Sequence, residues 1–178
     1  MKKIILAVFL TAALAGISHA ENTRYMRAMF GVADAMQGAF TDGGNRVTSS
    51  ASFAPSLSAA LGLKFENNFA LEAEFYTVSG VKQRWTPDQR TDLTAYMINA
   101  AEYFPFRPGG KLNPFVGAGA GVINSTFALS KSNAPAFNIF LGALVKDAAV
   151  FRLKYLTGKT YGSPHNIFGL EAGYKFKL

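Results

Sequence analysis

The 178-residue sequence has no cysteine, only two histidines and no apolar run long enough to cross a membrane as a helix. Without cysteine there is no disulfide framework, no lipid-carrying cysteine and no thiolate metal site. No two histidines or clustered carboxylates have the spacing of metal ligands, so we expect no metal and no cofactor. The apolar run at 4–17 is shorter than the roughly 20 residues that a spanning helix needs.

The amino-terminal segment has the three parts of a secretory signal. Met1-Lys2-Lys3 is positively charged, residues 4–17 are apolar, and Ser18-His19-Ala20 offers small residues before a cleavage point. The sequence therefore predicts a cleaved signal peptide at 1–20 and a single domain at 21–178. Cleavage would remove two lysines and lower the net charge from +7 to +5.

Apolar and polar side chains alternate in segment after segment of the predicted mature chain. In 55–65 the odd-numbered residues are apolar apart from an initial proline, whereas the even-numbered ones are small, polar or charged. A period of two residues sends these sets to opposite faces of a sheet. Eight segments show the pattern: 25–33, 55–65, 69–76, 92–104, 114–129, 137–145, 150–157 and 167–178.

The number and spacing of these segments predict an all-β, eight-stranded antiparallel up-and-down transmembrane β-barrel. The count is even, and each segment has about the ~9–11 residues of a tilted membrane strand. Connections at 66–68 and 146–149 are very short, and that at 105–111 is of modest length. Those at 35–52, 79–91, 130–136 and 158–166 are longer or more polar. We expect the last strand to pair with the first and both termini to be periplasmic. A secreted soluble β-sandwich is the alternative.

The polar faces of these segments carry charges of both signs. In an eight-stranded barrel they would point into a lumen only wide enough for side chains, where charges must pair. We therefore predict a plugged lumen with a charge network and no open pore. The network comprises Arg27, Lys64, Glu72, Glu74, Arg152, Lys154, Glu171 and Lys175.

Glycines and aromatic residues give two further expectations. Gly117, Gly119 and Gly121 share one face, which predicts a bare inward stripe that leaves room for large neighbouring side chains. Several aromatic residues fall near strand ends, which suggests interfacial girdles. They are Tyr25, Tyr103, Phe104, Phe106, Phe115, Tyr155, Tyr174 and Phe176.

The stretch at 103–122, YFPFRPGGKLNPFVGAGAGV, resembles the outer-membrane β-barrel family that includes opacity-type surface antigens and outer-membrane proteins A and X. The chain's end resembles the family's assembly signal, with Glu171, Gly173, Phe176 and Leu178 at its positions. Leu178 stands where Phe or Trp is usual, which implies a weaker signal. The resemblance implies the outer membrane of a Gram-negative bacterium, contact with lipid and lipopolysaccharide, and insertion by the barrel-assembly machinery.

Three function classes remain, none of which involves nucleic acid. The favoured one is a structural or surface-interaction barrel, resembling a surface antigen or adhesin, whose loops 35–52 and 79–91 meet an external ligand. Basic loop residues offer a surface for anionic lipid or phosphate groups, although a solvated loop surface is the simpler interpretation. The alternative is a small porin-like channel.

A lipid A-modifying enzyme is a distant third class. Ser163, His165 and Glu171 have the side chains of a hydrolase triad. Lipid A deacylases, however, place the serine two residues after the histidine, where this sequence has Ile167. Glu171 should also point into the lumen. We therefore assign no catalytic residue and interpret His165 as a solvated loop residue.

Overall fold

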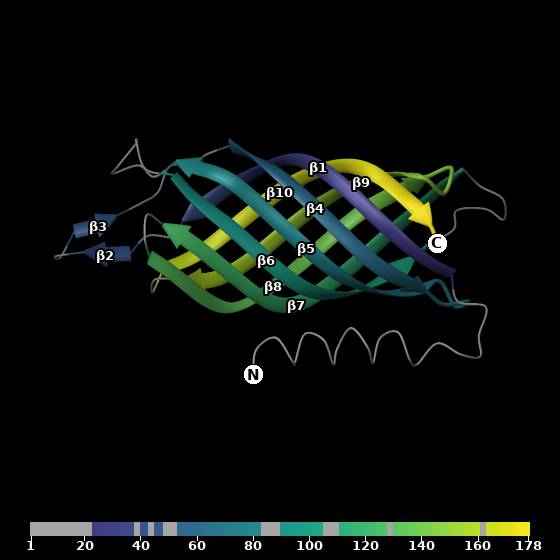
Figure 1. The fold of residues 1–178 in the computed structure, drawn as a ribbon, viewed down its shortest axis with the longest axis horizontal. Coiled ribbons are helices and arrows are strands. Elements are labelled where there is room, and N and C mark those ends of the chain that lie inside the picture. Colours follow the sequence, from purple (N-terminus) through teal and green to yellow (C-terminus); the bar gives the residue numbers. More distant parts are fainter. Residues whose placement is uncertain are drawn as a thin grey trace.

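The structure, a computed structural model, describes residues 23–37, 40–42, 45–47, 53–82, 90–104, 111–127, 130–160 and 163–178. Eight long antiparallel strands close into one barrel, which confirms the predicted fold (Figure 1). They are β1 (Thr23–Gln37), β4 (Phe53–Lys64), β5 (Phe69–Lys82), β6 (Arg90–Tyr103), β7 (Leu112–Phe127), β8 (Ser130–Val145), β9 (Ala149–Thr160) and β10 (Ser163–Lys177). The predicted signal peptide lies outside the described residues. None of the described residues forms a helix long and apolar enough to span a membrane.

The two ends of the barrel differ, and we call them the turn end and the loop end. The turn end holds the connections at 65–68 and 146–148 together with Leu178 (Figure 1). Lys146 and Asp147 have φ angles of 50° and 57°, and the Ala148 N–H donates to the Val145 carbonyl over 3.1 Å. Positive φ at both central residues is the type I′ geometry that matches the twist of a two-stranded hairpin. The short turns predicted at 66–68 and 146–149 are thus confirmed, whereas 105–110 lies outside the described residues.

At the loop end the strands run further than the sequence predicted. The prediction of loops at 130–136 and 158–166 is wrong. β8 already starts at Ser130, and only residues 161–162 lie between the end of β9 and the start of β10. β1 and β5 likewise extend into the loops predicted at 35–52 and 79–91. The first of these also contains a separate hairpin of β2 (Phe40–Asp42) and β3 (Asn45–Val47). Apolar alternation stops where the outward side chains become polar, but backbone pairing continues, so hydropathy underestimates strand length.

The register of the eight ladders fixes the tilt of the strands. A path from Arg27 through the registered partner on each next strand returns to β1 at Gln37, ten residues further on. The intermediate partners are Ala60, Glu74, Met97, Gly121, Ala136, Gly158 and His165. With ~3.3 Å per residue and ~4.8 Å between strands, this stagger corresponds to a tilt of about 40°.

Two prolines mark places where the barrel wall divides at the loop end. The β4–β5 ladder ends at Ser56, next to Pro55, and the β8–β9 ladder ends at Ala136, next to Pro135. Beyond these points β5 still pairs with β6, and β8 still pairs with β7. A proline has no N–H to donate and is tolerated where a ladder stops. The loop end therefore consists of two four-stranded leaves, β5–β6–β7–β8 and β9–β10–β1–β4.

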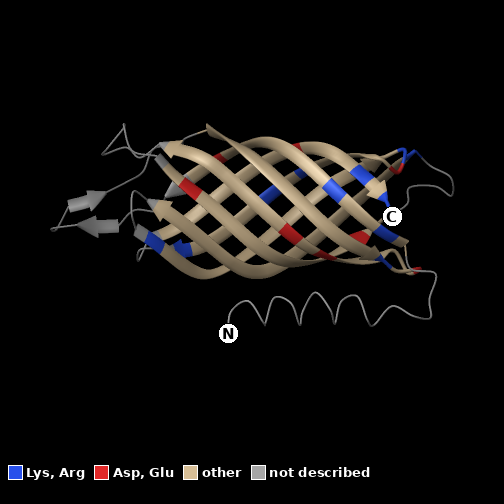
Figure 2. Cartoon of the chain, in the orientation of Figure 1, with Lys and Arg blue, Asp and Glu red and all other residues tan. Residues whose placement is uncertain are grey.

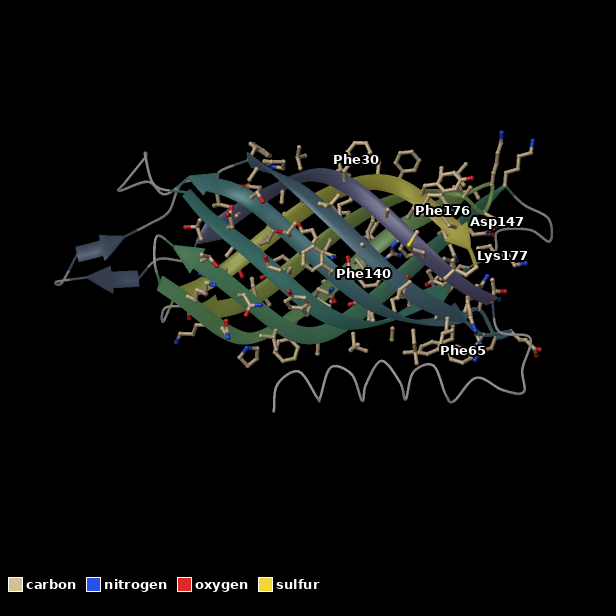
Figure 3. All side chains as sticks on the ribbon, in the orientation of Figure 1. Phe30, Phe65, Phe140, Asp147, Phe176 and Lys177 are labelled. Atoms are coloured by element: carbon tan, nitrogen blue, oxygen red, sulfur yellow. The ribbon has the colours of Figure 1, made fainter. Side chains whose placement is uncertain are left out.

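The outward and inward faces have opposite polarity to those of a soluble protein. Phe30 lies outside the barrel and is 70% exposed, whereas Phe140 lies inside and is 3% exposed (Figure 3). On β8 the outward residues Phe137, Ile139 and Leu141 are all about 60% exposed. The inward face of the same strand carries the buried Asn138. Such a band of exposed apolar side chains over a closed barrel is suited to lipid.

We predict that charge is tolerated at the edge of this band but not at its middle. Leu141→Arg places a cation near the centre of the outward face of β8, where the cost is about 2–4 kcal/mol of unfolding free energy. Asn133→Arg, on the same face near the loop end, should cost about 0–1 kcal/mol. Denaturant titration of both variants in lipid vesicles measures the difference. Equal costs at the two positions would contradict a membrane-facing exterior.

Candidate functional site

The first part of the lumenal charge network joins β1 to β5. Arg27 makes a bidentate ion pair with Glu72, donating from Nη1 to Oε1 over 2.9 Å and from Nη2 to Oε2 over 2.7 Å. The Tyr25 hydroxyl donates to the same Glu72 Oε1 over 2.5 Å. Gly62 makes this possible, since a Cβ there would overlap the Tyr25 ring. Both carboxylate oxygens of Glu72 are therefore satisfied by fixed donors.

The second part of the network is centred on Glu74 of β5. Its Oε1 accepts hydrogen bonds from Arg152 Nη2 over 2.5 Å and from Lys154 Nζ over 2.6 Å. Its Oε2 accepts one from Asn99 Nδ2 over 2.6 Å. Arg152 also donates from Nε and Nη2 to Glu171 Oε2, over 2.9 and 2.6 Å. Strands β5, β6, β9 and β10 are thus tied together across the lumen.

This network, which we call the charged layer, is balanced and buried. Its three cations, Arg27, Arg152 and Lys154, face its three carboxylates, Glu72, Glu74 and Glu171, and none of the six is more than 3% exposed (Figure 2). Removing six charges from water is costly, so each must be paired to remain charged. The layer therefore carries no net formal charge, and its ions are held in fixed pairs.

Apolar clusters lie on both sides of the charged layer. Towards the loop end, a cluster that includes Val78, Leu93, Ile123 and Leu156 fills the lumen. Towards the turn end, Phe115, Phe140, Leu144 and other apolar side chains do the same. Phe140 also stacks beneath the charged layer, with its ring centre 5.4 Å from the Arg152 guanidinium carbon. The ions are thus enclosed along the barrel axis.

The inward glycine stripe predicted on β7 is present and has the expected use. A Cβ at Gly117 would overlap the Phe140 ring, and one at Gly121 would overlap the Tyr96 carbonyl oxygen first and the Met97 side chain next. At Gly119 it would overlap the side-chain oxygens of Asn99 and Asn138. The absence of side chains here therefore gives room for the polar chain in which Asn138 donates to Asn99 over 3.0 Å.

Two residues of the predicted network, Lys64 and Lys175, lie outside the charged layer. Both are at the turn end, where they pack on tyrosine rings. The prediction that Tyr25, Tyr103 and Phe115 form an interfacial girdle is wrong, because all three point into the lumen and are at most 3% exposed. Each of these positions is an even number of residues from a lumenal residue on its own strand, so its side chain faces inward even though it lies near a strand end. By contrast, three further members of the predicted girdle, Phe104, Tyr174 and Phe176, are 42–50% exposed. Tyr155 is half-buried, and Phe106 lies outside the described residues.

The interpretation of His165 as a solvated loop residue is wrong. It lies in β10, paired with Gly158 and Gln37, and is 6% exposed. The loop end extends further than hydropathy indicated, and this encloses the residue. Glu171 is six residues further along the same strand face, or about 20 Å at ~3.3 Å per residue, and binds Arg152. The two side chains therefore do not meet as a hydrolase pair. Among the described residues no group of acidic or histidine side chains is arranged to hold a metal.

The residues of the predicted assembly signal fall on both faces of β10. Glu171 belongs to the charged layer, and Gly173 sits where a Cβ would overlap the Ala28 carbonyl of β1. Phe176 and Leu178 face outward and are 42% and 70% exposed. The pattern thus combines packing within the wall with an apolar outward end, while its recognition by an assembly machinery stays a prediction.

Sequence reasoning missed several members of the charged layer. Tyr25, Asn99 and Asn138 bind its carboxylates or each other, and Ser58 accepts a hydrogen bond from Arg152 Nη2 over 3.2 Å. All four have the inward parity of their strands. That inward position along each strand could have identified them, but they carry no formal charge, which was the signal used to predict the network.

The closed antiparallel wall, the apolar exterior and the paired charges inside define a small transmembrane β-barrel. No protein-family model matches the sequence, and no curated protein matches it. Among solved structures, the neisserial surface protein A aligns over 87% of this chain and 97% of its own, with 17% identity and a TM-score of 0.62. Ail of Yersinia pestis aligns over 86% and 99%, with 17% identity and a TM-score of 0.50. The fold is therefore that of small eight-stranded outer-membrane barrels.

We predict that breaking one ion pair of the charged layer is strongly destabilising. Glu74→Gln leaves Arg152 and Lys154 without a shared carboxylate in an enclosed lumen, which should cost about 3–5 kcal/mol. Asp147→Asn, at an exposed turn, is the control and should change the unfolding free energy by at most about 0.5 kcal/mol. Guanidinium titration of the refolded proteins gives both values. A cost for Glu74→Gln as small as the control's would show that the layer is hydrated and loosely paired.

Proposed function

We propose that this chain is an integral outer-membrane barrel of a Gram-negative bacterium with a structural or surface-interaction role. The observation that carries the proposal is the combination of an outward apolar band with a neutral lumenal layer in which each ion has at least one ion-pair partner. An apolar band needs lipid, and fixed ion pairs between apolar clusters leave no continuous path for hydrated ions. The proposed partners are outer-membrane lipid and lipopolysaccharide along the wall, and the barrel-assembly machinery during insertion.

In this proposal the turn end faces the periplasm and the loop end faces outward. Bacterial barrels have short periplasmic turns and longer extracellular connections. Here the tight turns and Leu178 share one end, and the β2–β3 hairpin projects from the other (Figure 1). The two four-stranded leaves extend the wall beyond its apolar band on the same side. The surfaces exposed to the exterior are therefore these leaves together with the segments 35–52 and 79–91.

An anionic external ligand suits the composition of the loop end. The segment 79–91 contains Lys82, Arg84 and Arg90 against Asp88, and Lys131 and Lys159 are exposed on β8 and β9. Such an excess of positive charge raises the local concentration of polyanions. Ail has been crystallised with the heparin analogue sucrose octasulfate. That complex supplies a probe for this chain but does not assign it a ligand.

Gel migration, membrane fractionation and conductance test the barrel proposal together. We expect heat-modifiable migration, recovery in the outer-membrane fraction, and no sustained single-channel openings after reconstitution in planar bilayers. Sustained openings would instead support the second candidate, a small channel. Recovery as a soluble periplasmic protein would contradict the membrane assignment.

Retention on a heparin column tests the surface-interaction role. The refolded barrel should bind at low salt and elute as ionic strength rises, because exposed charges are screened within about 10 Å at 0.1 M salt. Replacing Lys82, Arg84 and Arg90 with glutamine should lower the eluting salt concentration. The matched control is replacement of three uncharged residues in 48–52, which should not change elution. Identical elution of all three proteins would remove segment 79–91 as the binding surface.

A further inference from the structure

Two lysines lie over tyrosine rings in the lumen at the turn end of the barrel. Lys175 of β10 places Nζ 3.7 Å from the centre of the Tyr25 ring and 4.8 Å from that of Tyr103. Lys64 of β4 places Nζ 5.0 Å from the same Tyr103 ring. Strand β1, which carries Tyr25, lies between β10 and β4 in the wall. Both ammonium groups therefore lie over the Tyr103 ring, and that of Lys175 also lies over the Tyr25 ring.

Lys175 is buried without an anionic partner. It is 9% exposed, and within the described strands and turns no oxygen atom accepts a hydrogen bond from its ammonium group. A ring face attracts a cation but provides no formal negative charge and no lone-pair acceptor for its three N–H groups. This differs from Lys154 in the charged layer, which stacks on Tyr76 at 4.1 Å and also binds Glu74.

Two carboxylates that act on Lys175 electrostatically already have other hydrogen-bond partners. The carboxylates of Glu72 and Asp147 both attract the Lys175 ammonium group electrostatically. Glu72, however, is held by Arg27 and Tyr25, and Asp147, which is exposed, accepts a hydrogen bond from Asn113 Nδ2 over 3.0 Å. Among the contacts of the described residues, neither carboxylate makes an ion pair with Lys64 or Lys175. The two ammonium groups thus repel each other, and the carboxylates that attract Lys175 do so without a direct ion pair.

The rim outside the lysine pair carries charges of both signs, and Lys177 is the cation beside the pair on β10. Figure 2 shows Lys and Arg together with Asp and Glu at this end of the barrel, and Figure 3 shows Lys177 and Asp147 there. Lys177 pairs with Tyr25 along the backbone and is exposed. An anion approaching from outside would therefore meet Lys177 first and then the two ring-bound lysines. Lys64, which is only half-buried, leaves the pair open to this approach.

We propose that Lys64 and Lys175 form an oxyanion-binding site at the turn-end mouth of the barrel, which takes a carboxylate or phosphate group. The anion would accept hydrogen bonds from both ammonium groups and replace the missing acceptor of Lys175. The tyrosine rings would fix the two lysine side chains, so little rotamer freedom is lost on binding. A soluble anion and the headgroup of an anionic lipid share this chemistry and are separated by experiment.

The test uses the refolded full-length mature chain in an uncharged detergent, with amide chemical shifts as the readout. Inorganic phosphate and acetyl-alanine serve as the phosphate and carboxylate probes. We expect saturable shifts at Lys64, Lys175 and their neighbours with at least one probe. Lys175→Gln should weaken binding about tenfold, equivalent to about 1.4 kcal/mol. Lys146→Gln, an exposed lysine in the 146–148 turn, is the matched control and should leave the affinity within about twofold, which is under 0.5 kcal/mol.

A second arm distinguishes the two sources of the anion. Nanodiscs with phosphatidylglycerol are compared with nanodiscs of neutral lipid, both without free phosphate. Shifts at the lysine pair only with phosphatidylglycerol indicate a lipid headgroup, whereas shifts only with soluble probes indicate a soluble anion. If Lys175→Gln does not refold, the more exposed Lys64→Gln carries the test.

The proposal is overturned by either of two results. One is the absence of saturable shifts in every arm, and the other is an equal loss of affinity in Lys146→Gln, which would mean general attraction to the cations of the rim. Each result is separate from the proposed outer-membrane role, because heat-modifiable migration would still report a folded barrel.

Discussion

Closure of the wall by β1 and β10 is the constraint on which the rest of the structure depends. Thirteen registered pairs, from Tyr25↔Lys177 to Gln37↔His165, remove the free sheet edges that would otherwise face lipid. In a bilayer every backbone N–H and C=O within the apolar region must be bonded internally, and only a closed barrel achieves this with strands. The ten-residue stagger of the closed wall then sets the tilt and the narrow radius.

A narrow lumen determines how charges can be accommodated. Because side chains fill an eight-stranded barrel, the inward Arg27, Arg152 and Lys154 cannot remain hydrated and must meet carboxylates across the axis. Glycine supports this arrangement from the wall: Gly62 admits the Tyr25 ring, and Gly119 admits the Asn99–Asn138 pair. The same closure explains the turn-end mouth, where Lys64 and Lys175 rest on rings with no carboxylate of their own.

Much of this arrangement follows from period-two patterning, and the rest depends on register. Parity alone places Glu72, Glu74 and Arg152 in one lumen, because any closed barrel with this alternation turns them inward. Parity cannot show that Arg152 bridges Glu74 and Glu171 while Lys64 stays outside the layer, since partners are set by the stagger between strands. Strand ends were missed for a different reason: polar outward residues such as Asn133 end the apolar pattern but not the ladder. His165 was misplaced in consequence.

The most direct test of this account is the lipid exposure of matched leucines, measured by methyl NMR with a lipid-soluble relaxation agent in bilayers. Leu153 and Leu170 face outward at 47% and 60% exposure, whereas Leu144 and Leu156 lie in the lumen at 3% and 1%. We expect strong broadening of the methyl signals of the first pair and little change in those of the second. Broadening of Leu144 and Leu156, or protection of Leu153 and Leu170, would contradict a closed barrel with lipid outside and paired charges within.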